Sequence, residues 1–120
     1  MLFMMKTIFL DFDGVLFDST KEAYLLSRYA YSGISVFDEI EQNDYRLFCN
    51  YRYLIGNSWQ YYHLLNALKS TDIVVEFQKH IKARSQADKN FDLEFQNARK
   101  RLIAEHLEFW QELDTPYPFL

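Results

Sequence analysis

The sequence has little of the residues that interrupt a fold or brace it covalently. Its 120 residues include three glycines, two prolines and one cysteine. The scarcity of glycine and proline argues against a disordered or loop-rich chain. A lone cysteine, Cys49, cannot form an intrachain disulfide, which is typical of a reducing compartment. We expect Cys49 to be buried as a small apolar side chain.

Basic residues are not in excess, and no apolar run is long enough to span a membrane. The chain contains 13 Lys and Arg residues and 17 Asp and Glu residues, which gives a net charge of −4. No basic face lies beside stacking aromatics, which argues against nucleic-acid binding. The apolar segment MLFMMKTIFL (residues 1–10) is too short for a bilayer and runs into acids instead of a cleavage site. We therefore expect a cytoplasmic protein with neither membrane nor nucleic acid as a partner.

Hydrophobic residues make up 49% of the chain and aromatic residues 18%, which is enough for one buried core. Nearly every position from Leu2 to Leu10 is apolar, as in a strand that is buried on both faces. After Asp18 the pattern becomes helical. The sequence thus predicts a mainly α chain, a bundle of four or five helices, plus one N-terminal strand.

The helix boundaries are predicted from capping residues and apolar stripes. Ser19 and Glu22 have the spacing of a capping box, and Gly33 can end the helix that follows. Four more helices are expected to begin near Ser35, Ser58, Thr71 and Asp92, the last of them reaching Leu113. The segment 82–89 between the last two helices reads as a solvated loop. Pro116 and Pro118 favour an extended exit.

The stretch TIFLDFDGVLFDST (residues 7–20) carries the chemistry of the sequence. Asp11 and Asp13 are two apart at the end of the predicted strand, so their carboxylates point to the same side. Two carboxylates held this close repel unless a cation lies between them or one is protonated, and Mg²⁺ prefers such oxygen ligands. One carboxylate can attack phosphorus as a nucleophile, and the other can act as general acid and base. A calcium-binding loop is excluded because Val15 and Leu16 stand where that loop needs a ligand and a glycine.

The run IFLDFDGVLFDS (residues 8–19) resembles motif one of the haloacid dehalogenase-like (HAD) hydrolases. The helices that follow resemble a helical cap inserted after the first strand of an α/β Rossmann-like core. The resemblance implies a first strand and motif-one loop at residues 1–15, a cap at 16–114 and a linker returning to the core at 115–120. Asp at the third motif position is the pattern of the phosphatase and phosphomutase branches.

The resemblance assigns roles to individual positions. Asp11 corresponds to the nucleophile and Asp13 to the general acid/base, and the Asp11 carboxylate and the Asp13 backbone carbonyl would bind Mg²⁺. Gly14 would permit the tight turn. In the cap, YRYLIGNSW (residues 51–59) is the best match to a substrate-facing loop, in which Arg52 would hold a substrate anion and Gly56 would let the backbone approach. Alternatively, Arg52 is a solvated helix residue and Gly56 a helix break.

The implied function is that of a Mg²⁺-dependent phosphatase of a small phosphorylated metabolite, acting through an aspartyl-phosphate. The Ser or Thr, the Lys and the second acidic pair of the family have no counterpart in sequence order, so we expect the 120-residue chain alone to lack activity. The alternative is a truncated fragment or a non-catalytic helical module that binds a partner. If the chain ends at Leu120, we expect the apolar strand Leu2–Leu10 to be disordered, to pack onto the cap, or to pair with another copy or a separate core chain, and its apolar character favours such association.

Overall fold

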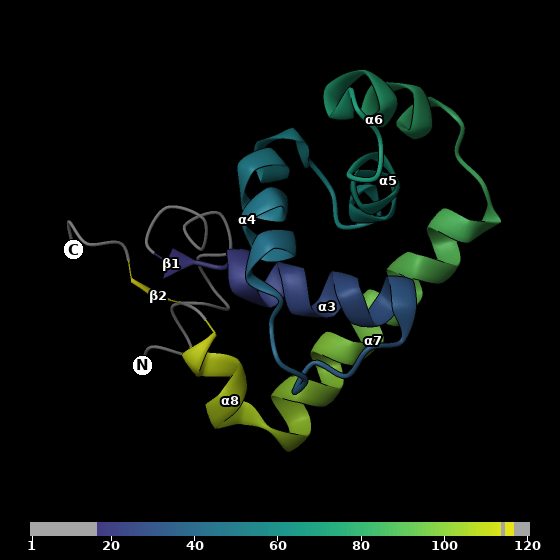
Figure 1. Cartoon of the computed structure of the whole chain (residues 1–120). Helices are drawn as coiled ribbons and strands as arrows, with labels where there is room; N and C mark the ends of the chain where they lie inside the picture. The colour runs from purple at the N-terminus through teal and green to yellow at the C-terminus, as the bar shows by residue number, and fades with distance from the viewer. Residues whose placement is uncertain (1–16, 114, 117–120) are drawn as a thin grey trace.

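The computed structural model describes residues 17–113 and 115–116, and within them the chain is mainly helical, as predicted (Figure 1). In chain order the elements are β1 (Phe17–Asp18), α3 (Thr20–Ser32), α4 (Gln42–Tyr51), the 3₁₀ turn η1 (Arg52–Leu54), α5 (Gln60–Ala67), α6 (Ile73–Lys82), α7 (Gln86–Glu105), α8 (Leu107–Glu112) and β2 (Thr115–Pro116). The predicted strand Leu2–Leu10 lies outside the described residues.

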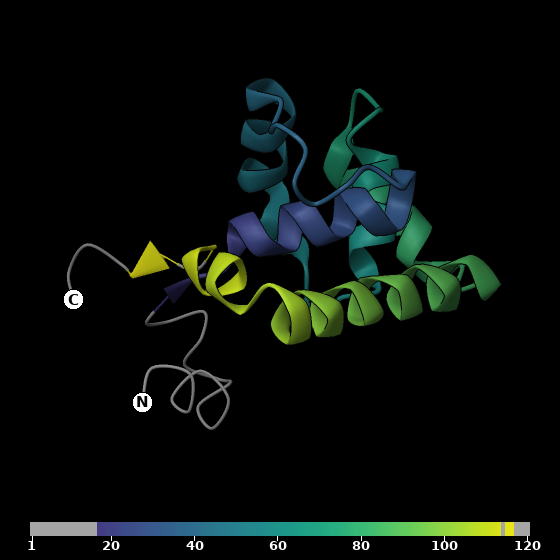
Figure 2. The ribbon, with the colours of Figure 1, turned by 90° about the horizontal axis from the view of Figure 1, so that it is seen from below.

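Helix α3 is the centre of the bundle. It packs along α7 on one side and contacts α4 and α5 on the other, an arrangement that both views show (Figures 1 and 2). Its buried residues accordingly run without interruption from Glu22 to Ser27 instead of forming one stripe. A helix surrounded by neighbours buries more than one face, so its sequence need not be strongly amphipathic.

The two ends of α3 differ from each other in how well the sequence predicts them. Gly33 ends the helix as expected, with φ of 74° and its N–H donating to the Tyr29 carbonyl at 2.8 Å. The predicted capping box at the start is wrong, because the Ser19 side chain makes no capping hydrogen bond. Glu22, its expected partner, is buried and pairs with Arg99 instead. A long-range contact therefore replaces the local one.

The segment 34–41 is a loop and not the start of a helix near Ser35, which corrects the prediction. Arg28 holds this loop by donating to three backbone carbonyls, those of Ser35 (3.0 Å), Asp38 (2.8 Å) and Glu39 (2.8 Å). Helix α4 begins only at Gln42, where the Glu41 carboxylate accepts from two free backbone amides. The loop's carbonyls are satisfied by a side chain, so it needs no helical hydrogen bonds.

Helices α5 and α6 form a packed pair beside α3. The buried face of α5 is Tyr61, His63, Leu64 and Ala67, whereas Trp59 and Tyr62 are only half-buried. Asp72 caps α6, since its side chain accepts from the Val75 amide at 3.3 Å. Thr71, the predicted cap, lies one residue too early.

The long C-terminal helix of the prediction is two helices. Helix α7 begins at Gln86, six residues before the expected start, and its capping box joins Ser85 and Asp88. Residues 86–89 of the predicted solvated loop are therefore helical, and Asp88 among them is fully buried. The chain then breaks at His106 before α8. The predicted four or five helices are six α-helices in the described part of the chain.

Three aromatic rings from three helices stack through the hydrophobic core. Tyr61 of α5 lies between Phe48 of α4 and Phe95 of α7, with centroid distances of 5.4 and 5.8 Å and nearly parallel planes. All three are almost completely buried. Cys49, next to Phe48, is exposed, so its predicted burial is wrong. The stack fixes α4, α5 and α7 around one end of α3.

Strands β1 and β2 pair antiparallel, with Phe17 opposite Pro116 and Asp18 opposite Thr115. The segment that leads into the helices thus lies beside the segment that leaves them, at one side of the bundle (Figure 2).

None of the helices that the structure describes is long and apolar enough to cross a membrane.

Candidate functional site

A polar cleft of about 210 Å³ opens beside the first turn of α3. Its walls come from that turn, from the segment η1–α5 and from α7. The lining residues are Ser19, Glu22, Ala23, Arg52, Ile55, Gly56, Asn57, Ser58, Tyr61, Phe95 and Arg99. The cleft therefore lies immediately after β1, at the point where the chain passes from residues 1–16 into the helical bundle.

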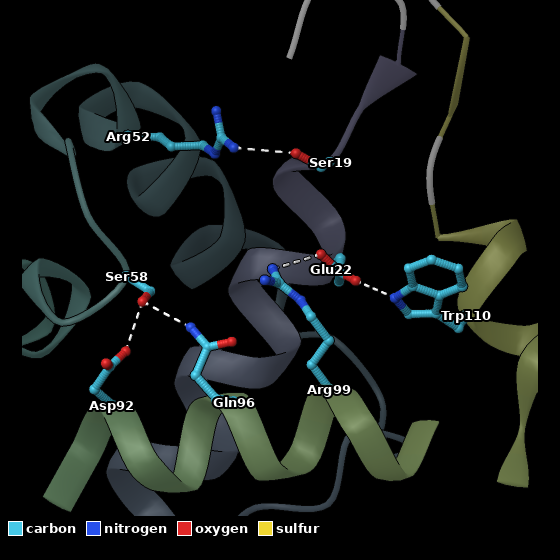
Figure 3. Close-up of polar contacts among 8 residues, drawn as sticks. All are labelled: Ser19, Glu22, Arg52, Ser58, Asp92, Gln96, Arg99 and Trp110. Atoms are coloured by element: carbon cyan, nitrogen blue, oxygen red, sulfur yellow. Dashed lines mark hydrogen bonds and ion pairs between the residues drawn. The ribbon is translucent and has the colours of Figure 1, made fainter. Parts of the chain in front are cut away.

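Arg52 forms one wall of the cleft. It is the first residue of η1, which ends α4, and its side chain points across to the start of α3 (Figure 3). Its Nη2 donates to Ser19 Oγ at 3.2 Å. Its Nε is buried and has no hydrogen-bond partner among the described residues. The partners of Arg52 are thus the neutral Ser19 and Tyr61 hydroxyls, and its Nε–H remains unused.

Glu22 and Arg99 form the opposite wall. Arg99 Nη2 donates to Glu22 Oε1 at 2.9 Å, and Trp110 Nε1 donates to the other oxygen, Glu22 Oε2. Figure 3 shows the carboxylate of Glu22 between these two side chains, which come from α7 and α8. Glu22 is 2% exposed, so its charge would be costly to bury without such partners. The pair is a structural link as well as a cleft wall.

A hydrogen-bonded bridge closes the far side of the cleft. Ser58 Oγ donates to Asp92 Oδ1 at 2.6 Å and accepts from Gln96 Nε2 at 3.0 Å (Figure 3). Asp92 and Gln96 are on successive turns of α7, while Ser58 precedes α5. The bridge thus holds the segment 56–58 against α7 and fixes the shape of the cleft.

Tyr61 and Phe95 form the floor, and both are at most 5% exposed. Burial raises the pKa of the Tyr61 hydroxyl above its ordinary value, while the neighbouring Arg52 guanidinium acts in the opposite direction. The net shift is upward, so Tyr61 is a neutral phenol at physiological pH. A neutral floor leaves the two arginines and Glu22 as the charged groups that line the cleft.

The cleft is chemically suited to a small anion. Arginine presents a planar fork of donors that matches carboxylate and phosphate oxygens, and it stays charged at any pH the protein meets. Arg52 and Arg99 approach from different elements, and the Nε of each is buried without a partner among the described residues. Glu22 offsets one of the two positive charges.

Of the residues predicted to form a site, Arg52 and Gly56 both line this cleft. The Gly56 amide donates to Gln60 Oε1, and an added Cβ would lie 3.3 Å from that same flexible side-chain end. Space inside the loop therefore does not demand glycine at this position. Asp11, Asp13 and Gly14 lie outside the described residues.

Sequence reasoning missed Glu22, Ser58, Asp92, Gln96 and Arg99. Arg99 carried a signal, because it is adjacent to Ala98 and four residues after Phe95, both on the apolar stripe of α7. A charged residue at the edge of a buried stripe needs a partner, and only the folded chain shows that it is Glu22. The described residues contain no group of three side chains suited to a metal ion.

Comparison of the chain with protein-family models, with curated proteins and with solved structures finds no match.

Proposed function

We propose that this protein is part of a HAD-like, Mg²⁺-dependent phosphatase of the cytoplasm that hydrolyses a small phosphorylated metabolite. The sequence IFLDFDGVLFDS supports it, since it supplies two carboxylates and a glycine after an apolar run. The observation that carries the proposal is the cleft beside β1, because it opens right after this motif and presents Arg52 and Arg99.

The pairing of β1 with β2 also supports a cap. A domain that is inserted into another must leave it and return to it at neighbouring points. Here the segments before α3 and after α8 are paired through Phe17 and Pro116. The helical bundle can therefore move as one body over whatever precedes Phe17, with the paired segments as its hinge.

In the proposed reaction, Asp11 attacks the phosphorus of the substrate and the P–O bond to the leaving group breaks. Asp13 donates its proton to the leaving oxygen and then takes a proton from the water that hydrolyses the aspartyl-phosphate. Mg²⁺ held by Asp11 and Asp13 would offset the repulsion between the carboxylate nucleophile and the phosphate. Arg52 binds the substrate from the cap, and closure of the cap excludes bulk water from the reaction.

Activity against a panel of phosphomonoesters tests the proposal, using this chain and any longer form of the protein. Asp11→Asn is expected to lower kcat by about a thousandfold or more in the active form, because the amide is no nucleophile. Asp38→Asn, at an exposed position in the loop 34–41, is the matched control and is expected to leave kcat unchanged. An Asp11→Asn variant with normal turnover would refute the assignment.

A second candidate function is a non-catalytic helical module that binds a partner. An exposed aromatic cluster favours it: Phe37 is 53% exposed and lies against His106 (4.9 Å between ring centroids) and Phe109 (4.8 Å). Pairing of Leu2–Leu10 with another copy or with a separate core chain, as proposed from the sequence, would also be a partner-binding function. Light scattering of the chain with and without residues 1–10 tests it, and a monomer in both cases would exclude self-association through that segment.

A further inference from the structure

The cleft holds two cations that are not equivalent. Arg52 reaches it from the end of α4 and interacts with two neutral hydroxyls, those of Ser19 and Tyr61. Arg99 reaches it from α7 and is anchored by the buried carboxylate of Glu22. Each guanidinium still has a buried Nε–H without a partner among the described residues. Leaving such a donor unpaired is unfavourable, so an acceptor that reaches both would bind well.

The charge of the cleft favours an acceptor with a single negative charge. Among the described residues, two arginines and one glutamate line the cleft, and together they carry one net positive charge. Asp92 lies behind Ser58, bonded to its hydroxyl, and is not among the lining residues. A carboxylate carries one charge and is planar, so it matches both the net charge and the fork of an arginine. A phosphate dianion would leave one negative charge uncompensated.

We propose that Arg52 and Arg99 together form a subsite for one carboxylate group of a small ligand, with Glu22 setting the charge of that subsite. The inference rests on the proposed function only in taking this ligand as the substrate, whose leaving group would then bear the carboxylate. Arg99 is a specificity-determining residue in this arrangement.

NMR titration of the 120-residue chain tests the subsite directly, because the Nε–Hε signals of arginine report contacts at the guanidinium. The probes are sodium lactate and inorganic phosphate, at constant ionic strength. Lactate is expected to shift the signals of both Arg52 and Arg99 in a saturable way. Arg52→Gln and Arg99→Gln are each expected to weaken lactate binding about tenfold or more, since each removes a charge-assisted hydrogen bond.

Arg101→Gln is the matched control. Arg101 lies on the same helix as Arg99, but it is exposed and donates to the Tyr29 hydroxyl at 3.0 Å, outside the cleft. Its substitution removes the same charge from the protein. It is expected to change the dissociation constant for lactate by less than about twofold, because an exposed charge outside the cleft is screened by salt. Equal losses in Arg99→Gln and Arg101→Gln would mean that only net charge matters and would overturn the proposal.

Glu22→Gln supplies a test of opposite sign, which guards against variants that simply unfold. Glutamine keeps an oxygen for one of the two donors but removes the charge, so the cleft gains a second net positive charge. Lactate binding is expected to strengthen several-fold, and phosphate binding to strengthen more. Weaker lactate binding by a folded Glu22→Gln variant would contradict the role given to Glu22.

Three further outcomes would overturn the proposal: shifts that rise linearly without saturation, an Arg99 signal unaffected by lactate, or phosphate binding tighter than lactate binding in the unaltered chain. The titration does not depend on turnover. If the protein binds lactate but has no phosphatase activity, the carboxylate subsite is supported and the phosphatase function is refuted. If it has phosphatase activity but does not bind lactate, the phosphatase function is supported and the subsite is refuted.

Discussion

His63 Nε2 lies 2.7 Å from Asp88 Oδ1, and the two side chains are 3% and 0% exposed. His63 is on α5 and Asp88 is in the first turn of α7, so the contact ties together two helices that the sequence separates by a whole helix. The approach is close but not well aligned for a hydrogen bond. Asp88 is anchored further by the Ser85 amide, which donates to its Oδ2 at 3.2 Å.

We expect Asp88→Asn to destabilise the protein by about 1–3 kcal/mol, because the buried Asp88 side chain would lose the charge that strengthens its hydrogen bond from the Ser85 amide and its contact with His63. Asparagine keeps the size of the side chain and an oxygen for the Ser85 amide, so the change isolates the charge. Chemical denaturation measures the effect. Asp38→Asn, an exposed counterpart, should stay within about 0.5 kcal/mol of the unaltered protein. Unchanged or increased stability in Asp88→Asn would show that the contact is not stabilising.

Gly33→Ala is expected to lower the free energy of unfolding by about 1 kcal/mol. Gly33 has φ of 74°, a conformation that alanine adopts only with strain. A Cβ at this position would meet no atom within 4 Å, so the cost comes from the backbone and not from packing. Gly33→Asn should cost less, since asparagine tolerates this conformation better. Equal thermal stability of the alanine variant and the unaltered protein would contradict the assignment.

The cap of α4 predicts a specific pH dependence. The backbone amides of Asp44 and Asn43, which donate to the Glu41 carboxylate, hold its pKa below the ordinary value of 4.5. A lowered folded-state pKa means that the stabilisation is present above pH 4.5 and is lost as the pH falls through the folded-state pKa. Glu41→Ala should therefore be less stable than the unaltered protein at neutral pH, and the difference should shrink in acid.

Thermal melts between pH 7 and pH 3 measure this difference, and Glu39→Ala is the control. The Glu39 contribution to the fold that the structure shows is its backbone carbonyl, which alanine retains. A difference for Glu41→Ala that stayed constant down to pH 3 would show that the carboxylate is not the cap.

Local signals in the sequence predict the fold well where local chemistry decides it. The helical character and the end of α3 at Gly33 both follow from capping and apolar spacing. The errors arise where a distant residue intervenes. Arg28 satisfies the carbonyls of the loop 34–41, so a helix expected near Ser35 does not form there.

The candidate site divides in the same way. Arg52 and Gly56 could be named from the sequence, and both line the cleft. The Glu22–Arg99 pair could not, because its two residues are 77 positions apart and Glu22 reads locally as half of a capping box. The Ser58–Asp92 bond, over 34 positions, is hidden for the same reason. Burial creates the need for these partners, and burial depends on the whole fold.

The pairing of β1 with β2 determines how the bundle responds to a pulling force. Tension applied at Phe17 and Pro116 acts first on this two-residue ladder, whose hydrogen bonds then break one after another. Close behind it lie the Ser19–Arg52 hydrogen bond and the Glu22 carboxylate, which accepts from Trp110 of α8 and Arg99 of α7. A stretched chain would therefore lose the wall of the cleft before it lost the aromatic stack behind it.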